Sequence, residues 1–503
     1  MTNKKKKNVF MGPTTVMIIL TLLVAIISTI LSKIGFNGSQ TLIVDGTLET
    51  TMVTVNNAFS IDGIKYVFGN ILTNLSLLKL VSAFIVSLIG ISICEKSGLL
   101  KAFFKNEKLN SNKLVVLTVF IGLISSILGE YSYALLLPLT ALFYKYNDSN
   151  PVYGTLVMFL SITLGLGLGL IFDYNDYVLG NLTQISASLD VDKNYKYSLL
   201  STIYISISSL LIVTALAPRI FKRFLKPKMG SVIKEEIEDN TSKKALYFSN
   251  FAFLLLLVLV VYMIIPGLPG SGILLDNNQK TYIAKLFSDN APFKEGIVFI
   301  IAIIMMICGY IYGKVSKTIT SSNEYSLALS KSFDGMGYVF VLLFFSSILI
   351  NVVEYTNIGT VLGTILVDFM GSLEFSGIPL IITFFIVVIL MSILLPSTLD
   401  KWILLSPIVV PLFMRSNITP EFTQFIFKIA DGVGKTLTPI FPCLLMTIGI
   451  MQKYNNAQNE ITLFSTIKKY LSTVTIIALI LLFVIVAWHI VGIPLGIGSY
   501  TTL

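Results

Sequence analysis

The sequence predicts an all-α polytopic membrane protein with about nine transmembrane helices and two re-entrant hairpins. Of its residues, 54% are hydrophobic and only 13% are charged, whereas soluble domains are about 25% charged. Apolar runs of spanning length recur along the whole chain, as in helical membrane proteins. Two further apolar runs are interrupted by a polar tip, and each half is too short to cross a hydrocarbon core of about 30 Å.

The expected topology begins in the cytoplasm, because cytoplasmic segments are rich in lysine and arginine and lysines occupy positions 4–7. No small-residue cleavage site follows the first apolar run, so we expect a retained span and not a signal peptide. The nine expected spans are residues 14–35, 77–98, 152–190, 196–217, 246–266, 294–313, 336–354, 421–451 and 470–495. The third and eighth spans are broken, and a surface helix is expected over Ser316–Phe333. The longest polar insertions are residues 36–74, 219–244 and 267–291.

The interrupted runs, residues 114–146 and 376–415, resemble each other and are the predicted hairpins. In each, Ser-Ile-Leu precedes the polar tip, and two prolines 13 residues apart follow it. A glycine then lies 14 residues after the second proline, where we expect a break in the next helix. The matched positions are Ser126 and Ser392, Pro138 and Pro407, Pro151 and Pro420, and Gly165 and Gly434. Apolar sequence also produces such matches by chance.

The expected topology favours a true repeat, because the first hairpin would enter from the cytoplasm and the second from outside. We therefore predict a single membrane domain, residues 1–503, that contains two inverted repeats, residues 77–217 and 336–451. Transporters with such repeats bind their cargo near the bilayer midplane, between hairpin tips and unwound helices.

Charged residues lie at membrane depth near the C-terminal end, where a charge costs at least a few kcal/mol and needs a partner, a cavity or a substrate. Asp431 lies three residues after Lys428 and four before Lys435, so the three side chains can share one helix face. They either neutralise one another or form a site. In such a site Asp431 would bind a coupling cation or proton, and a lysine would meet an anionic substrate.

The two hairpin tips hold further candidates. Asp400 and Lys401 are adjacent and point apart, so one can face a binding site, or both can be structural. Trp402 either stacks on an aromatic ring of the substrate or packs in the interior. Glu130, at the first tip, is expected to pair with Lys401, to bind a cation or to lie in a solvated cavity.

Small polar and acidic residues near the predicted breaks are the remaining candidates. Asp173 and Asp176 lie within one helical turn of the break in residues 152–190, where they bind the coupling ion or cap a turn. Ser126 and Ser392 occupy matched positions and either contact an ion or substrate or pack.

Other classes of function fit the sequence poorly. Cys94, Cys308 and Cys443 are isolated, and His489 is the single histidine, so we expect no metal site beyond a sodium site. An enzyme would need a nucleophile–base pair or metal ligands, and we expect none. A channel would need rings of like charge or carbonyls along a continuous pore. The net charge of +9 comes from loop lysines and arginines and does not suggest nucleic acid.

The motifs resemble the p-aminobenzoyl-glutamate transporter (AbgT) family from the second span to the last. Cys94 to Leu100 reads C-E-K-S-G-L-L and is similar to the family's A-E-K-S-G-L-L. Asn357-Ile358-Gly359 is similar to N-L-G. The most specific matches are Lys401-Trp402, Ser406 to Pro411, Thr419 to Gln424, Lys428 to Asp431, and Thr438-Pro439.

The resemblance implies a homodimeric secondary transporter in the cell membrane, coupled to sodium or protons. It would carry p-aminobenzoyl-glutamate or export sulfonamide-like antimetabolites. It also implies functional roles for Asp176, Trp402, Asp431 and Pro439, and Lys428 stands where the family has Arg. The second tip departs from the family's G-S-A-S-A-K-W, because Leu399 and Asp400 replace small residues. A dicarboxylate or a peptide-like solute therefore stays open as cargo.

Overall fold

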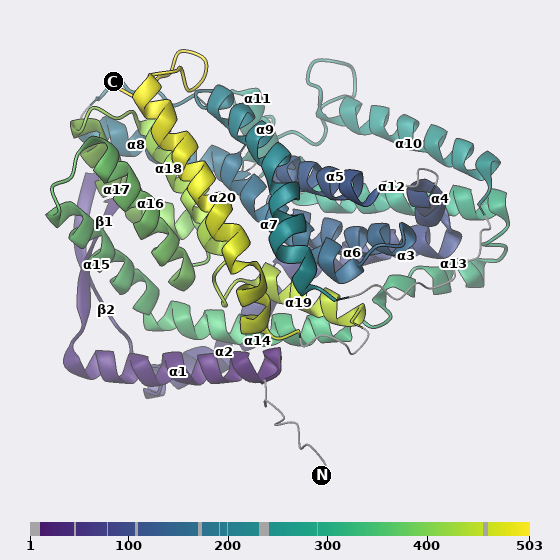
Figure 1. Cartoon of the computed structure of the whole chain (residues 1–503), viewed down its shortest axis with the longest axis horizontal. Coiled ribbons are helices and arrows are strands. Elements are labelled where there is room, and N and C mark those ends of the chain that lie inside the picture. The colour runs from purple at the N-terminus through teal and green to yellow at the C-terminus, as the bar shows by residue number, and fades with distance from the viewer. Residues whose placement is uncertain are drawn as a thin grey trace, which may run out of the picture.

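The computed structural model describes residues 11–44, 47–77, 79–105, 109–169, 174–190, 192–198, 200–230, 241–288, 290–455 and 461–503. Helices make up nearly all of this part of the chain, as Figure 1 shows. The predicted helical membrane class is confirmed. The lysines at positions 4–7 and the candidate Asp173 lie outside the described residues.

The elements of the first half begin with a long helix and a two-stranded sheet. They are α1 (Pro13–Ile34), β1 (Asn37–Val44), β2 (Thr47–Thr54), α2 (Ile61–Leu77), α3 (Lys79–Ser97), α4 (Leu99–Lys105), α5 (Ser111–Ile124), η1 (Ser125–Leu128), α6 (Tyr131–Tyr146), α7 (Pro151–Leu168), α8 (Tyr174–Asp190), α9 (Ile203–Ile220), η2 (Phe221–Leu225) and η3 (Lys226–Lys228).

The second half is helical throughout its described residues. Its elements are α10 (Lys243–Ile264), α11 (Tyr282–Phe287), α12 (Pro292–Ser316), α13 (Ser322–Ala328), η4 (Lys331–Phe333), α14 (Gly337–Thr356), α15 (Ile358–Ser372), α16 (Gly377–Leu394), α17 (Thr398–Arg415), α18 (Pro420–Lys435), α19 (Pro442–Lys453) and α20 (Leu463–Val491).

Within the described residues, ten helices are long and apolar enough to cross a membrane. Eight of them match predicted spans: α1, α2 with α3, α7, α9 with η2 and η3, α10, α12, α14 and α20. The other two, α5 with η1 and α16, are the first arms of the predicted hairpins. The eighth predicted span, residues 421–451, is the broken pair α18 and α19.

Three segments differ from the sequence-based expectation. Residues 36–74 form a β-hairpin and α2 where a polar insertion was expected; its threonines, valines and isoleucines favour strands. Helix α15 lies where no helix was predicted. The surface helix predicted over Ser316–Phe333 is shorter: α13 starts only at Ser322, after a capping box formed by Ser321 and Glu324.

Both predicted hairpins are helix–turn–helix units that pack on the helix that follows them. Helices α5 and α6 pack on α7, and α16 and α17 pack on α18. Each of the two matched glycines faces the first arm of its own hairpin. A Cβ atom on Gly165 would lie 2.7 Å from Cα of Leu123, and one on Gly434 would lie 3.1 Å from Cα of Ile389. Leu123 and Ile389 each precede their matched serine by three residues, so the two contacts correspond.

The sequence placed the helix breaks at these two glycines, and in the structure the helices end one to three residues after them. Helix α7 continues past Gly165 to Leu168, and α18 continues past Gly434 to Lys435. The chain leaves α7 at Gly169, whose φ of +57° belongs to the left-handed region that glycine adopts without strain. Gly165 and Gly434 also allow the backbones of α7 and α18 to pack closely against the first arms of the two hairpins.

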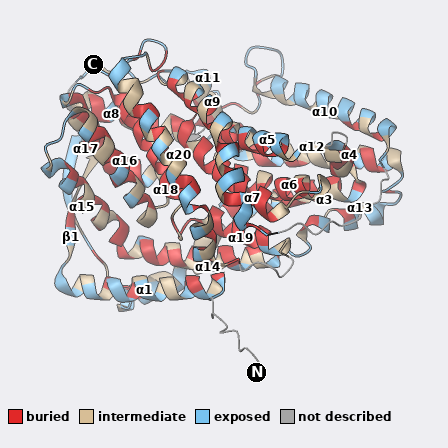
Figure 2. Cartoon of the chain, in the orientation of Figure 1, coloured by how far each residue is buried: buried red, intermediate tan, exposed pale blue. Residues whose placement is uncertain are grey.

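Helices α7 and α18 cross at the centre of the molecule through a second pair of glycines. A Cβ atom on Gly432 would lie 2.9 Å from the carbonyl oxygen of Thr163 and 3.1 Å from Cα of Gly167. Figure 2 shows α7, α18 and α19 as largely buried, whereas α1 and α10 are exposed along much of their length. Since the exposed side chains of α1 and α10 are mostly apolar, they suit contact with lipid.

We predict that Gly432→Ala lowers the midpoint of thermal unfolding, because the added methyl group meets backbone atoms that cannot rotate away. Overpacking of this kind costs about 1–3 kcal/mol. Gly371→Ala in α15 is the matched control, since nothing lies within 4 Å of its added carbon. Thermal unfolding of the purified protein in detergent measures both changes. Equal midpoints for Gly432→Ala and the wild type would contradict the close crossing.

Candidate functional site

The two hairpin tips meet the broken helices near the crossing of α7 and α18. The first tip turns at Gly129, whose φ is +54°, and leads into α6 after Glu130. The second tip turns at Ser397, whose hydroxyl accepts the backbone N–H of Asp400 and caps α17. Helix α18 ends at Lys435, and the hydroxyl of Thr438 in the break donates to the carbonyl of Ile393, 2.8 Å away. The break is therefore tied to the second hairpin.

Three ion pairs join these elements, and each one links two different segments. Lys401 of α17 pairs with Asp431 of α18, and Lys428 of α18 pairs with Asp176 of α8. Lys435, at the end of α18, pairs with Glu130 of the first tip at 2.9 Å. Lys401, Asp431, Asp176 and Lys435 are buried and Lys428 is nearly so, whereas the side chain of Glu130 is 48% exposed. The prediction that Glu130 would pair with Lys401 is wrong, because Lys435 lies opposite Glu130.

Hydroxyl groups complete the surroundings of Asp431. The hydroxyl of Thr398 donates to Oδ2 of Asp431 at 2.5 Å, and the hydroxyl of Ser392 lies 3.1 Å from Oδ1. Nζ of Lys401 donates to the hydroxyl of Ser392 at 3.0 Å. Asp431 thus contacts both sides of the second tip, since Ser392 ends α16 and Thr398 begins α17. A change in the charge of Asp431 must alter how the tip is held.

Trp402 is buried completely and packs within the protein. Its indole N–H donates to the hydroxyl of Thr183 at 3.0 Å, and that hydroxyl donates to Oε1 of Gln424 at 2.5 Å. The amide of Gln424 in turn donates to the hydroxyl of Tyr197 at 3.0 Å. The ring of Trp402 also packs on Phe427, with 4.5 Å between centroids. This network holds α17 against α8 and α18, and Thr183, Gln424 and Tyr197 were not singled out by sequence.

Gln424 had a recognisable signal, because it is a polar residue in the broken span that also carries Lys428, Asp431 and Lys435. Thr183 and Tyr197 had none, since threonine and tyrosine are common where helices meet lipid or loops.

The remaining candidates occupy separate places. Asp400 is exposed in the first turn of α17 and lines neither cavity at the tips. Ser126 is buried in η1 of the first hairpin. Pro439 lies in the break between α18 and α19.

A small cavity of about 20 Å³ lies between the paired charges. It is lined by side chains of both broken helices and the second tip, among them Thr163, Asn175, Asp176, Thr398, Lys428 and Asp431. A cavity needs roughly 10–15 Å³ of this kind of volume to hold a water molecule. The space therefore accepts one water-sized particle between two carboxylates. Within the described ranges, no group of three or more His, Cys, Asp and Glu side chains gathers as a metal site would require.

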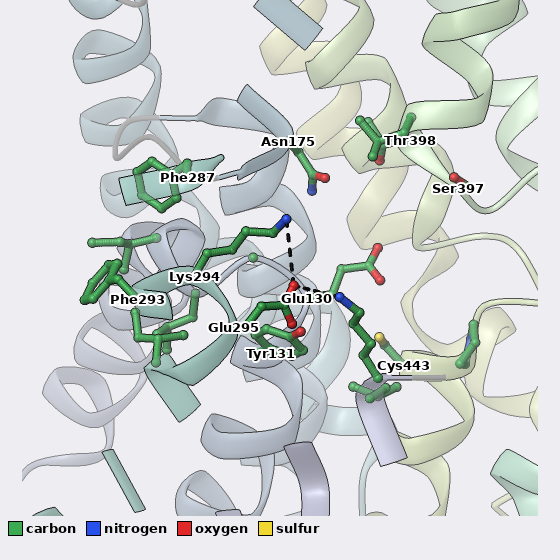
Figure 3. A pocket seen from close by; sticks show the side chains of 18 residues that line it. Glu130, Tyr131, Asn175, Phe287, Phe293, Lys294, Glu295, Ser397, Thr398 and Cys443 are labelled. Carbon is green, nitrogen blue, oxygen red and sulfur yellow. Dashed lines mark hydrogen bonds and ion pairs between the residues drawn. The ribbon is translucent and has the colours of Figure 1, made fainter. Parts of the chain in front are cut away.

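A second cavity, of about 570 Å³, adjoins the first, because Asn175 and Thr398 line both. Figure 3 shows the rings of Phe287 and Phe293 on one side of it and Ser397 and Thr398 on the other. Its volume lies within the range of about 300–1,000 Å³ that small-molecule sites occupy.

Charged side chains of α3 and α12 also line this larger cavity, together with Glu130 of the first tip. Lys79 pairs with Glu295 at 2.8 Å, and Lys294 lies 3.7 Å from the same carboxylate oxygen. Both tips and the surrounding helices thus contribute to one cavity (Figure 3).

The loop before α12 supports the aromatic wall of this cavity. Asp276 accepts hydrogen bonds from the hydroxyl of Ser288, at 2.7 Å, and from the backbone N–H of Asn278. These bonds hold the pKa of Asp276 below its usual range, with the bond from Ser288 as the larger cause. The backbone N–H of Phe293 donates to the carbonyl of Leu274, which ties the loop to the start of α12.

A helical membrane protein with two hairpin tips, two broken helices and paired charges between them has the architecture of a membrane transporter. The chain matches the AbgT putative transporter family over residues 4–503 and belongs to that family. Members of this family are transporters, so the chain is a multi-pass membrane transporter of a small molecule and not an enzyme.

The chain is also similar to individual proteins. The chain is 24% identical over 498 residues to the p-aminobenzoyl-glutamate transport protein of Escherichia coli (strain K12). The alignment covers 98% of this chain and 94% of that protein. The structure of Neisseria gonorrhoeae MtrF, described among antimetabolite efflux pumps, has a TM-score of 0.50 and 22% identity, with 98% of each chain covered. The YdaH transporter of Alcanivorax borkumensis has a TM-score of 0.49 and 23% identity, with 97% and 100% covered.

We predict that Lys401→Met destabilises the protein by about 3–5 kcal/mol, because it leaves the carboxylate of Asp431 buried without its ammonium partner. The double variant Lys401→Met/Asp431→Asn should recover most of this loss, since it removes both charges. Thermal unfolding of the wild type, the single variants Lys401→Met and Asp431→Asn, and the double variant in one detergent measures this double-mutant cycle. A double variant as unstable as Lys401→Met alone would show that the pair does not account for the loss.

Proposed function

We propose that this protein is a secondary active transporter of a small organic anion that resembles p-aminobenzoyl-glutamate, coupled to sodium ions or protons. The observation that carries the proposal is the set of three lysine–carboxylate pairs between the hairpin tips and the broken helices. Import of such an anion and export of sulfonamide-like antimetabolites are both compatible with it. The E. coli relative is named for p-aminobenzoyl-glutamate transport and MtrF is described with efflux pumps, which supports either direction.

The pairs give a physical reason for coupling. A cation or proton that binds Asp431 or Asp176 must compete with the ammonium group that each already contacts. An anion that binds one of these lysines must compete with the carboxylate. Once an ion pair has separated, its carboxylate can bind the cation and its ammonium group can bind the anion. Binding of either ligand therefore favours binding of the other. This effect of one ligand on the affinity for the other is a coupling free energy between two sites, and it is reciprocal.

The two cavities suggest where the ligands bind. The small cavity, with Asp176 and Asp431 in its wall, suits the coupling ion. The larger cavity, with Phe287, Phe293 and Lys294 in its wall, suits an anion with an aromatic or apolar body. Because Trp402 packs on Phe427, it would act by positioning α17, and the stacking surface for the substrate would come from the phenylalanines.

We further propose that the repeats 77–217 and 336–451 are related by inverted symmetry and that the hairpins are re-entrant. The corresponding contacts of Gly165 with Leu123 and of Gly434 with Ile389 support this relation. Movement of the hairpins against the surrounding helices would then open the cavity to alternate sides. We also propose that the N-terminus is cytoplasmic, that the protein lies in the cell membrane and that it functions as a homodimer.

A different cargo on the same fold is the second candidate. The second tip carries Leu399 and Asp400 where the family has small residues, and the lining of the larger cavity includes Leu399 and two glutamates. A dicarboxylate or a peptide-like solute would fit this mixture of charges. An ion channel would conduct without saturating, so saturable uptake that collapses with the ion gradient separates the two classes.

We predict that Asp431→Asn abolishes coupled transport, because the neutral amide lacks the negative charge that would hold a cation and takes up no proton near neutral pH. Uptake and efflux of p-aminobenzoyl-glutamate in proteoliposomes, with imposed sodium or proton gradients, measure the effect. Since the variant leaves Lys401 without its charged partner, rates are compared at equal amounts of folded protein. Asp334→Asn, which changes an exposed acid paired with Lys331, is the control. Coupled transport at the wild-type rate in Asp431→Asn would exclude the proposed role.

A further inference from the structure

A groove with basic side chains lies between the start of α5 and the end of α9, outside the site described above. It encloses about 580 Å³. Its polar rim consists of Ser111, Asn112, Arg219, Lys222 and Lys226. Its floor is apolar and includes Val115, Val116, Leu211 and Ala215. The groove therefore has a cationic end and a hydrocarbon end.

Among the described residues, the positive charges at the cationic end have no carboxylate partner in the groove. Nζ of Lys222 donates to the amide oxygen of Asn112 at 2.9 Å, and Nζ of Lys226 donates to the hydroxyl of Ser111 at 3.1 Å. Both acceptors are neutral, and no Asp or Glu is among the residues that line the groove. At the hairpin tips, by contrast, each lysine faces a carboxylate. Arg219, three residues before Lys222, adds a third positive charge to the same rim.

The hydrocarbon end belongs to the surface that faces lipid. Leu211 is 60% exposed and Val116 is 42% exposed. Both lie on helices that are long and apolar enough to cross a membrane, Ile203–Lys228 and Ser111–Leu128. Exposed apolar side chains on such helices contact acyl chains, so the floor of the groove continues into the bilayer.

Two hydroxyl groups in the wall of the groove have no hydrogen-bond partner among the described residues. They are the hydroxyl of Tyr153, a residue only 3% exposed, and that of Thr214. Buried hydroxyls in proteins are nearly always paired. Because neighbouring protein atoms shield both oxygens from the groove, they do not contribute to the binding of a ligand there.

We propose that this groove binds an acidic phospholipid. The phosphate group lies at Arg219, Lys222 and Lys226, and one acyl chain runs along Leu211 and Val116. Basic pockets between transmembrane helices bind acidic lipid headgroups through the same combination of charge and apolar surface. A free inorganic anion would use the rim but gain nothing from the floor. The bound lipid bridges α5, the outer arm of the first hairpin, to α9, and so adds to the contacts between them.

The proposal is tested by lipid titration of the purified protein in detergent, with the midpoint of thermal unfolding as the readout. Phosphatidylglycerol should raise the midpoint, and phosphatidylcholine with the same acyl chains should not. The double variant Lys222→Gln/Lys226→Gln should raise the half-saturating concentration of phosphatidylglycerol roughly thirtyfold, because each basic residue contributes about 1 kcal/mol to binding of an acidic lipid. Lys243→Gln/Lys244→Gln, at the exposed start of α10, removes the same charge elsewhere and should leave the response unchanged.

A second variant tests the apolar floor without a change of charge. Ala215→Trp fills the groove and should weaken the response to phosphatidylglycerol even if the lysine variant folds poorly. Equal responses to both lipids, or a wild-type response in Lys222→Gln/Lys226→Gln, would overturn the proposal. A shift of the same size with inorganic phosphate alone would assign the rim to a free anion instead. Native mass spectrometry of the wild type should retain phosphatidylglycerol in preference to phosphatidylcholine.

Discussion

The pairing of charges at membrane depth is the constraint on which this structure depends. Asp431, Lys401 and Lys428 could not lie in the interior alone, because the cost of an uncompensated charge there would exceed the gain from packing. Each is instead placed opposite a partner of the other sign on a different segment. The pairs therefore fix where the second hairpin, α8 and α18 lie relative to one another, and they keep these helices from packing in other registers.

Close backbone contact makes this pairing geometrically feasible. Side chains of lysine and aspartate reach each other only if the helices that carry them approach closely, and glycines permit that approach. Gly167 and Gly432 bring α7 and α18 together at their crossing, and Gly165 and Gly434 seat the hairpin arms against them. Small residues at helix interfaces serve this purpose in membrane proteins generally, since lipid provides no hydrophobic force between helices.

The same arrangement concentrates function between the tips. The small cavity beside Asp176 and Asp431 and the larger cavity beside Glu130 and Thr398 adjoin at the ends of the two hairpins. A ligand in either cavity contacts groups that also hold the hairpins in place. In the proposed transport cycle, binding and movement of the hairpins would be linked through the same side chains, which is the physical requirement for coupled transport.

By itself, the sequence determined the helical membrane class, the nine spans and the two interrupted segments, because these follow from the length of apolar runs and from the position of prolines and polar tips. The arms of the second hairpin, α16 and α17, agree with the predicted residues 376–415 to within a residue.

Only the tertiary structure decided the partners within the site. Lys435 pairs with Glu130, and Lys401 with Asp431, because those residues lie opposite each other after α18 packs against the second hairpin and α7. Trp402 faces Thr183 and Phe427 for the same reason. Periodicity along one chain shows which face of a helix is polar, but the partner that this face meets depends on contacts between helices that can lie as much as 305 residues apart in the sequence.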